Sequence, residues 1–152
     1  EENFIDDRTI SLRLYSGDKD HRILQEAILG YGGVRLLDIL RVENIHTYHM
    51  NEGHCAFLTL ALLEKFKGDE KKVRSLCHFT THTPVEAGHD HFAIRRCRKL
   101  LHGLLPENLD LPSWVQNSRL HMTELGMYFS RSAKASFSTF LRSANVPFFQ
   151  IL

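Results

Sequence analysis

The feature that most constrains the fold is a succession of strand, polar turn and helix that occurs twice in the middle of the chain. Residues 45–49 are rich in strand-forming types, and after a polar turn residues 56–66 have the apolar pattern of a helix. The order then repeats, with a predicted strand at 76–79, a polar loop over 80–92 and a helix to about residue 105. This alternation predicts an α/β fold, with a parallel sheet flanked by helices.

A longer helix is predicted before these units, over residues 19–41, with Asp18 as its N-cap. Gly30, Gly32 and Gly33 lie inside it, and each would cost about 1 kcal/mol relative to Ala on an exposed surface. These glycines therefore indicate close backbone packing or a break in the helix.

The remaining elements are less regular. The charged stretch 67–72 is expected to be a loop, and residues 120–133 are predicted to form another helix. Pro106, Pro112 and Trp114 mark an irregular connection between them.

Composition excludes several classes of protein. The 152 residues are enough for one domain, and a formal net charge of +1 with interspersed signs indicates neither a nucleic-acid-binding face nor an acidic-lipid-binding face. No apolar run is long enough to span a membrane, so no membrane association is expected. The three cysteines lack metal-site spacing and are odd in number, which favours a reducing cytoplasm. The chain begins with Glu rather than Met, and this suggests a piece of a longer protein.

Two clusters of polar residues each follow a predicted strand, HMNEGH at 49–54 and TTHTPVEAGHDH at 80–91. Ligands of open α/β sheets bind at the carboxyl ends of the strands, and these side chains could match the hydroxyl groups of a sugar. The alternative is structural: Asn51 or Thr81 could cap the next segment, and the outer histidines could be solvated loop residues.

Other chemistries compete with a sugar site. Ten histidines are many for this length, and His89 and His91 could bind a metal together with Glu52, His54 or His82, but no established metal-ligand spacing is present. The glycines at 30, 32 and 33 lack the strand-to-helix context of a phosphate loop. Cys55 could be an activated thiolate, although a small buried helix residue is the more common role.

Several motifs together resemble one family. They are RLYSGD at 13–18, HRILQE at 21–26, LGYGGVR at 29–35, HMNEGH at 49–54 and FTTHTPVEAGHD at 79–90. In this order and spacing they resemble the α-glucan phosphorylases that act on glycogen, starch or maltodextrin, in their shorter bacterial and archaeal form. The resemblance extends over residues 7–133, while Ser16 and Tyr31 are mild departures from the family pattern.

The resemblance implies a transferase with two Rossmann-like domains facing a deep cleft. Pyridoxal phosphate is then bound mainly by the C-terminal domain, and glucose 1-phosphate is released from an α-1,4-glucan and phosphate. Residues 1–133 would be part of the N-terminal domain, and residues 134–152 a divergent tail left by a frameshift or truncation. The lysine that forms the Schiff base with the cofactor is absent, so this chain is expected to hold no cofactor. No metal is expected either, because the established ligand spacings are missing. The resemblance also implies a homo-oligomer as an expectation for the full-length form.

The resemblance also assigns roles to residues. His82 matches the family histidine that holds the 6-hydroxyl of the reacting glucose, with its backbone carbonyl near the anomeric carbon. Glu52 and His54 match an acid and a histidine that line the pocket, with Asn51 and Thr81 adjoining them as substrate-binding residues. Asp18 matches an acidic position in the loop that gates entry.

Without the cofactor half, the chain alone is expected to be inactive. The rival hypotheses are a non-catalytic decayed product and a metal-dependent hydrolase.

Overall fold

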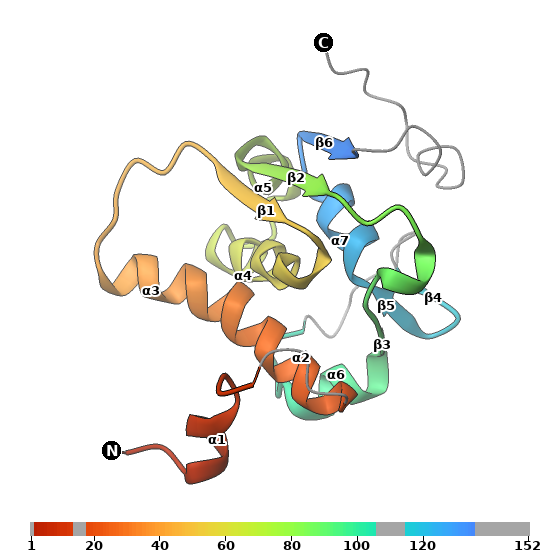
Figure 1. Cartoon of the computed structure of the whole chain (residues 1–152). Helices are drawn as coiled ribbons and strands as arrows, with labels where there is room; N and C mark the ends of the chain where they lie inside the picture. The colour runs from red at the N-terminus through yellow and green to blue at the C-terminus, as the bar shows by residue number, and fades with distance from the viewer. Residues whose placement is uncertain (1, 14–17, 106–114, 136–152) are drawn as a thin grey trace.

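A three-stranded parallel sheet forms the centre of the protein. The computed structural model describes residues 2–13, 18–105 and 115–135 (Figure 1). The strands lie in the order β1-β2-β6, so the central strand pairs with both neighbours in parallel. Their bounds are β1 Tyr48–Asn51, β2 Cys77–Thr81 and β6 Ser132–Ala135. The predicted α/β fold with a parallel sheet flanked by helices is therefore confirmed.

A second, smaller sheet is antiparallel and was not predicted. It has the order β3-β5-β4, with bounds β3 His91–Ala93, β4 Val115–Gln116 and β5 Arg119–His121. Asn117 and Ser118 join β4 to β5, and both have positive φ, at 50° and 60°. Two central residues of positive φ are typical of the tight turns that match the twist of paired strands.

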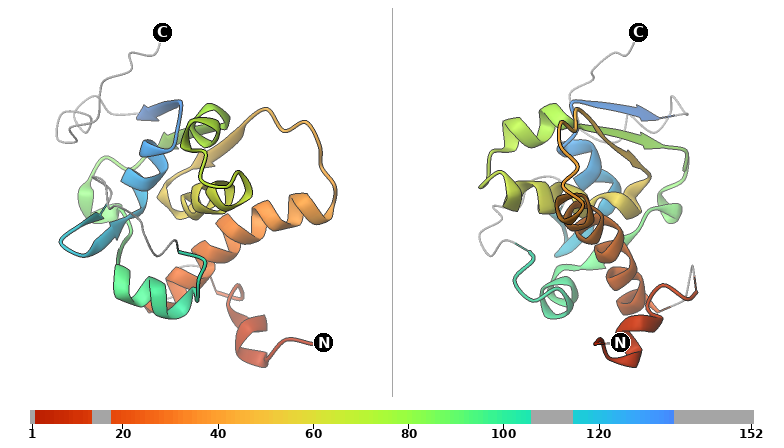
Figure 2. Two further views of the ribbon diagram at one scale, coloured as in Figure 1. Left: turned by 180° about the vertical axis from the view of Figure 1, so that it is seen from behind. Right: turned by 90° about the vertical axis from the view of Figure 1, so that its left-hand side faces the viewer.

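Helices pack against the parallel sheet. Figure 1 shows α2, η1 and α3 as one continuous rod, and Figures 1 and 2 both place α4 and α7 beneath the same face of the sheet. The bounds are α1 Ile5–Thr9, α2 Lys19–Ala27, η1 Ile28–Gly32, α3 Gly33–Ile39, η2 Gly53–Cys55, α4 Phe57–Lys65, α5 Glu70–Leu76, η3 Glu86–Gly88, α6 Ile94–Leu100 and α7 Met122–Tyr128. In the described ranges no helix is both long and apolar enough to cross a bilayer.

The rod from α2 to α3 confirms the long predicted helix and explains one of its glycines. Asp18 caps it, since the side chain accepts a hydrogen bond from the backbone N–H of Asp20 at 3.0 Å. The middle of the rod is the π-helical turn η1. A Cβ at Gly30 would lie 2.5 Å from the backbone nitrogen of Leu58, so α4 approaches the rod too closely for any side chain there. A Cβ at Gly33, in contrast, would meet no neighbouring atom within 4 Å.

The strands of the parallel sheet alternate between a buried and a polar face. Met50 and Phe79 are register partners and are fully buried. Phe79 packs against α7, where a Cβ at Gly126 would come within 2.6 Å of its ring. On the opposite face His49 Nε2 lies 2.9 Å from Thr80 Oγ1. Strands covered on both faces are usually apolar throughout, so this alternation indicates that the sheet packs on one side.

Several predicted boundaries were wrong. The stretch 67–72, expected to be a loop, contains the start of α5, which Asp69 caps by accepting a hydrogen bond from the N–H of Lys72. The helix predicted over 120–133 is α7 alone, with parts of β5 and β6 at its ends, and α6 stops at Leu100 rather than near residue 105. The first strand starts and ends later than predicted. The connection through Pro106, Pro112 and Trp114 and the tail from residue 136 lie outside the described residues, and the division at residue 133 stays a prediction.

We expect Gly30→Ala to destabilise the chain by about 1–3 kcal/mol, because the new methyl group would collide with the backbone of α4. Gly33→Ala is the matched control in the same rod. It has free space and helical φ, so it should be neutral or stabilising by up to about 1 kcal/mol. Urea unfolding of both variants measures the difference, and equal stabilities would contradict the close packing at Gly30.

Candidate functional site

The ends of β1 and β2 bring together residues that are about thirty positions apart in the sequence. Glu52 follows β1, and its carboxylate accepts hydrogen bonds from the loop after β2. The donors are the Thr81 hydroxyl at 3.0 Å, the Thr83 hydroxyl at 3.3 Å and the backbone N–H of His82. The backbone N–H of Glu52 also donates to the Thr80 carbonyl at 2.8 Å. The two polar clusters that follow the predicted strands thus meet at one edge of the sheet through Glu52 and His82.

The backbone at Glu52 is strained. Its φ of 74° and ψ of 167° lie in a region that residues other than glycine rarely adopt. The next residue, Gly53, packs against α7 so closely that a Cβ would lie 2.9 Å from Thr123 Oγ1. The tight contact at Gly53 and the hydrogen bonds of the Glu52 side chain together hold this unfavourable turn in place. Strain of this kind is concentrated at functional sites.

The other residues predicted after β1 and β2 differ in exposure. Asn51 is exposed and pairs with Thr80 in the sheet register. Thr81 is buried, while the side chain of His82 is exposed. Asn51 and His82 are therefore exposed at this edge, whereas Thr81 is buried and hydrogen-bonded to Glu52.

His54 is half-buried, two residues beyond Glu52. Burial lowers its pKa, and the positive charge of Arg22 lowers it further, while Glu52 and Asp90 act in the opposite direction. Its imidazole is therefore neutral at physiological pH, with one nitrogen able to donate and the other to accept a hydrogen bond.

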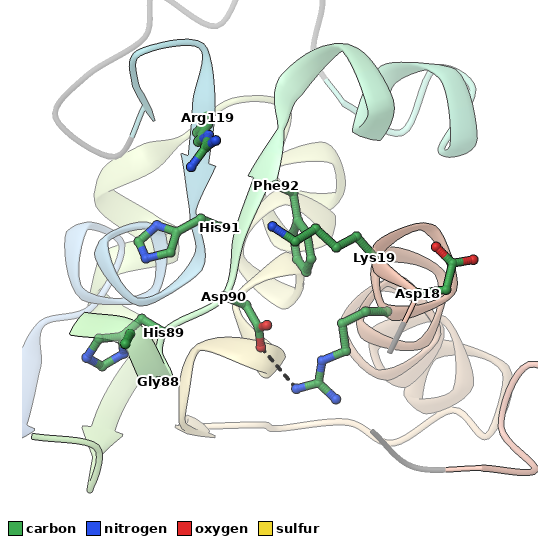
Figure 3. Close-up of a pocket in the computed structure, with 10 residues that line it drawn as sticks. Asp18, Lys19, Gly88, His89, Asp90, His91, Phe92 and Arg119 are labelled. Carbon is green, nitrogen blue, oxygen red and sulfur yellow. Dashed lines mark hydrogen bonds and ion pairs between the residues drawn. The ribbon is translucent and has the colours of Figure 1, made fainter. Parts of the chain in front are cut away.

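Asp18 lines a cavity that Glu52 does not line. This cavity, of about 460 Å³, is also lined by Lys19, Arg22, Arg119 and the segment 87–92. Figure 3 shows Lys19 extending toward Phe92, with the Asp18 carboxylate turned away from it. Among the described residues no hydrogen bond or ion pair joins Asp18 to Glu52.

A group of three charged residues around a buried glutamate was missed. Arg22 on α2 contacts two carboxyl groups, with Nη2 3.0 Å from Asp90 Oδ2 and Nε 2.9 Å from Glu26 Oε1. The Glu26 side chain has no exposed surface. Burial, reinforced by the negative charge of Asp90 and opposed by Arg22, raises the pKa of Glu26 to about 9. The spacing of Arg22 and Glu26 on a helix predicts an ion pair, but sequence shows neither the burial nor the third member.

The structure does not favour a metal centre or an activated thiol. The described part of the chain holds no group of three or more His, Cys, Asp or Glu residues that could bind a metal ion. His89 Nδ1 lies 2.7 Å from Thr123 Oγ1, and the rings of His91 and His121 stack edge to face at 4.2 Å. Burial raises the pKa of Cys55, which opposes thiolate formation.

We expect Glu52→Ala to be less stable than Glu52→Gly by about 1 kcal/mol, since both lose the same hydrogen bonds but only glycine relieves the backbone strain. Elsewhere on the surface, replacing alanine by glycine normally lowers stability. Chemical denaturation of the two variants tests the order, and a more stable alanine variant would contradict the strain at this position.

Comparison with known proteins gives the relatives of the chain. No protein-family model matches it. Maltodextrin phosphorylase from Thermococcus litoralis is 38% identical over 145 residues, which cover 88% of this chain and 17% of the relative. Glycogen phosphorylase from Mycobacterium tuberculosis is 40% identical over 110 residues, or 64% of this chain and 13% of the relative. Glycogen phosphorylase from Aquifex aeolicus is 42% identical over 92 residues, again 13% of the relative.

The chain thus spans less than a fifth of the length of these curated relatives. The match to the T. litoralis protein covers most of the present chain. On the strength of these identities, the chain belongs to the α-glucan phosphorylase family of enzymes and corresponds to a part of its longer members.

Proposed function

We propose that this chain is part of a pyridoxal-phosphate-dependent α-1,4-glucan phosphorylase and supplies the wall of the active site that binds the sugar. The parent enzyme would release glucose 1-phosphate from glycogen or maltodextrin. One contact supports this role. The carboxylate of Glu52 holds the start of segment 82–90, which we call the His82 loop, at the edge of the parallel sheet where ligands of such sheets bind.

His82 is the proposed catalytic residue. Its backbone is fixed by Glu52, whereas its side chain is exposed and can reach the 6-hydroxyl of a glucose. In the proposed role its backbone carbonyl lies beside the anomeric carbon. A dipole held in advance stabilises developing positive charge there without reorganising.

The other predicted residues divide into two roles. Glu52 and Thr81 are already hydrogen-bonded to each other, so their proposed contribution is to position the loop. Asn51 and neutral His54 retain hydrogen-bonding groups for sugar hydroxyls. Asp18, in its separate cavity at the start of α2, is proposed to act at the entrance rather than at the reacting glucose.

The residues present do not fit the cofactor. A lysine that forms a Schiff base is normally desolvated, and this lowers its pKa. Every lysine of the chain lies in the described ranges and is exposed. The ion pair with Asp38 raises the pKa of Lys65 rather than lowering it. We therefore place pyridoxal phosphate, and the chemistry that needs it, in the rest of the parent enzyme.

The proposed partners are an α-1,4-glucan and phosphate, with an oligomer of the full-length form as a further expectation. The proposed location is the cytoplasm, which agrees with the unpaired state of Cys55, Cys77 and Cys97. A decayed product without any ligand is the competing hypothesis, and glucan binding distinguishes the two.

Residues 51–54 and 80–83 make up the proposed sugar-binding wall, which we call the sugar wall. It is tested by NMR titration of the isotopically labelled chain with maltoheptaose. We expect amide shifts to change in residues 51–54 and 80–83. His82→Ala should weaken binding about three- to ten-fold, because one or two hydrogen bonds to an uncharged sugar are lost. Lys71→Ala, on the exposed surface of α5, is the control and should bind as the wild type does. Absence of shifts at these loops with millimolar ligand would reject the sugar wall.

The chain alone should form no glucose 1-phosphate from maltodextrin and phosphate, even with added pyridoxal phosphate, because none of its lysines has the setting that the cofactor needs. An enzyme-coupled assay measures the product against a control without protein. Product above that control would show that the cofactor half is dispensable.

A further inference from the structure

We propose that Arg22, Glu26 and Asp90 form a proton-dependent clamp that fixes the far end of the His82 loop to α2, with the proton carried by Glu26. Glu26 is then a positioning residue for the sugar wall, and this part of the inference rests on the proposed function.

The clamp follows from where its members lie. Arg22 and Glu26 are on α2, whereas Asp90 ends the loop that leaves β2 and precedes β3. The Arg22–Asp90 contact, drawn as a dashed line in Figure 3, joins this loop to the helix. Asp90 also accepts a hydrogen bond through its backbone oxygen from the N–H of Met122 at 3.1 Å. The loop is thus held near His82 by Glu52 and at its other end by Arg22.

Charge balance requires a proton in this group. One guanidinium lies between two carboxyl groups, so with both acids ionised the fully buried carboxylate of Glu26 would share its contacting cation with Asp90. Both oxygens of Glu26 are buried without a hydrogen bond of regular geometry in the described chain. Two carboxylates have no donor to share, but one proton makes the group neutral and lets Glu26 hydrogen-bond to Asp90.

Charged groups also surround Asp90, because Asp18, Lys19 and Arg119 line the same cavity. The charges that act on Glu26 itself are those of Asp90 and Arg22. Glu26 faces Asp90 on the loop and Arg22 on its own helix, and it acts electrostatically on Cys55 of η2 and Cys97 of α6. Burial raises the pKa of both thiols, that of Cys97 to about 12, so they are neutral.

His54 connects the clamp to the site. It lines a cavity of about 390 Å³ together with Arg22 and Glu26. Because its own pKa is lowered, it too is neutral near pH 7. A change in the clamp therefore reaches both the His82 loop and a second residue of the proposed wall.

Opening of the clamp must release the proton. In the closed state the pKa of Glu26 is about 9, and once hydrated it returns toward its ordinary value near 4.5. The folded state therefore binds the extra proton between these values, and the closed form loses stability as pH rises through this window. The opening constant should grow by up to about ten-fold per pH unit and level off above about pH 9.

Hydrogen–deuterium exchange of the full chain between pH 5.5 and 8 tests the clamp, after correction for the intrinsic pH dependence of exchange. In the wild type, opening of segment 82–92 should increase at least about ten-fold over this range. Glu26→Gln, which keeps the shape but carries no titrating proton, should flatten the increase. Glu64→Gln, in an exposed ion pair with Arg35, is the matched control and should follow the wild type.

Asp90→Asn provides a second variant in case the first does not fold. With this acid removed, Arg22 can stabilise ionised Glu26, so the pH dependence should also shrink. A wild-type loop whose opening does not change with pH, or the same increase in either clamp variant as in the wild type, would overturn the proposal.

Maltoheptaose titration of the same samples separates this inference from the proposed function. If the exchange pattern appears but no glucan binds, the clamp stands and the sugar wall is rejected. If glucan binds without the exchange pattern, the clamp is rejected and the sugar wall stands. If both hold, wild-type affinity should fall between pH 5.5 and 8 more than the affinity of Glu26→Gln.

Discussion

The Glu52 carboxylate accepts three hydrogen bonds from the segment that follows β2, and the geometry of the site depends on this contact. A parallel sheet places the ends of neighbouring strands at one edge, but it does not determine the direction of the loops that leave them. Glu52 supplies that direction for the residues around His82. The cost is an unfavourable backbone conformation at Glu52 itself, which the close packing of Gly53 on α7 helps to maintain.

The position of α2 depends on a different contact, between backbone and backbone. Gly30 lets the rod approach α4, and α4 in turn packs beneath the sheet. This approach brings Arg22 and Glu26 to the loop that ends at Asp90. The close packing at Gly30 therefore helps to place Arg22 and Glu26, which lie earlier in the same rod, beside Asp90.

Patterns with a strong local cause were predictable from sequence. The alternation of strand and helix gave the parallel sheet, and Asp18 was correctly placed as the cap of α2. The short helix α5 was missed because it buries only Val73, and its many charges resemble those of a loop. The turn at Asn117 and Ser118 was missed because it lacks the glycine that usually marks such a turn.

The candidate site was predictable to the extent that its residues follow strands. The polar clusters that contain Glu52 and His82 lie together because β1 and β2 are parallel neighbours, so their loops leave the same edge. Asp18, at the start of α2, lines a cavity with the segment 87–92. Glu26 could not be identified as buried, because a glutamate in a helix is usually solvated, and only the tertiary structure places Asp90 beside its partner Arg22.

The three-residue charge group also limits how the sequence can evolve. Loss of Arg22 alone would leave Asp90 without its ion-pair partner beside a buried acid. We therefore expect selection to remove single substitutions of Arg22. Replacement of Glu26 by glutamine keeps the charge balance of the group, so we expect this substitution to be tolerated. Once that step is taken, Arg22 and Asp90 form a simple pair that can be lost together. Related sequences should therefore retain all three residues, keep the pair with a glutamine, or replace the whole group by apolar side chains.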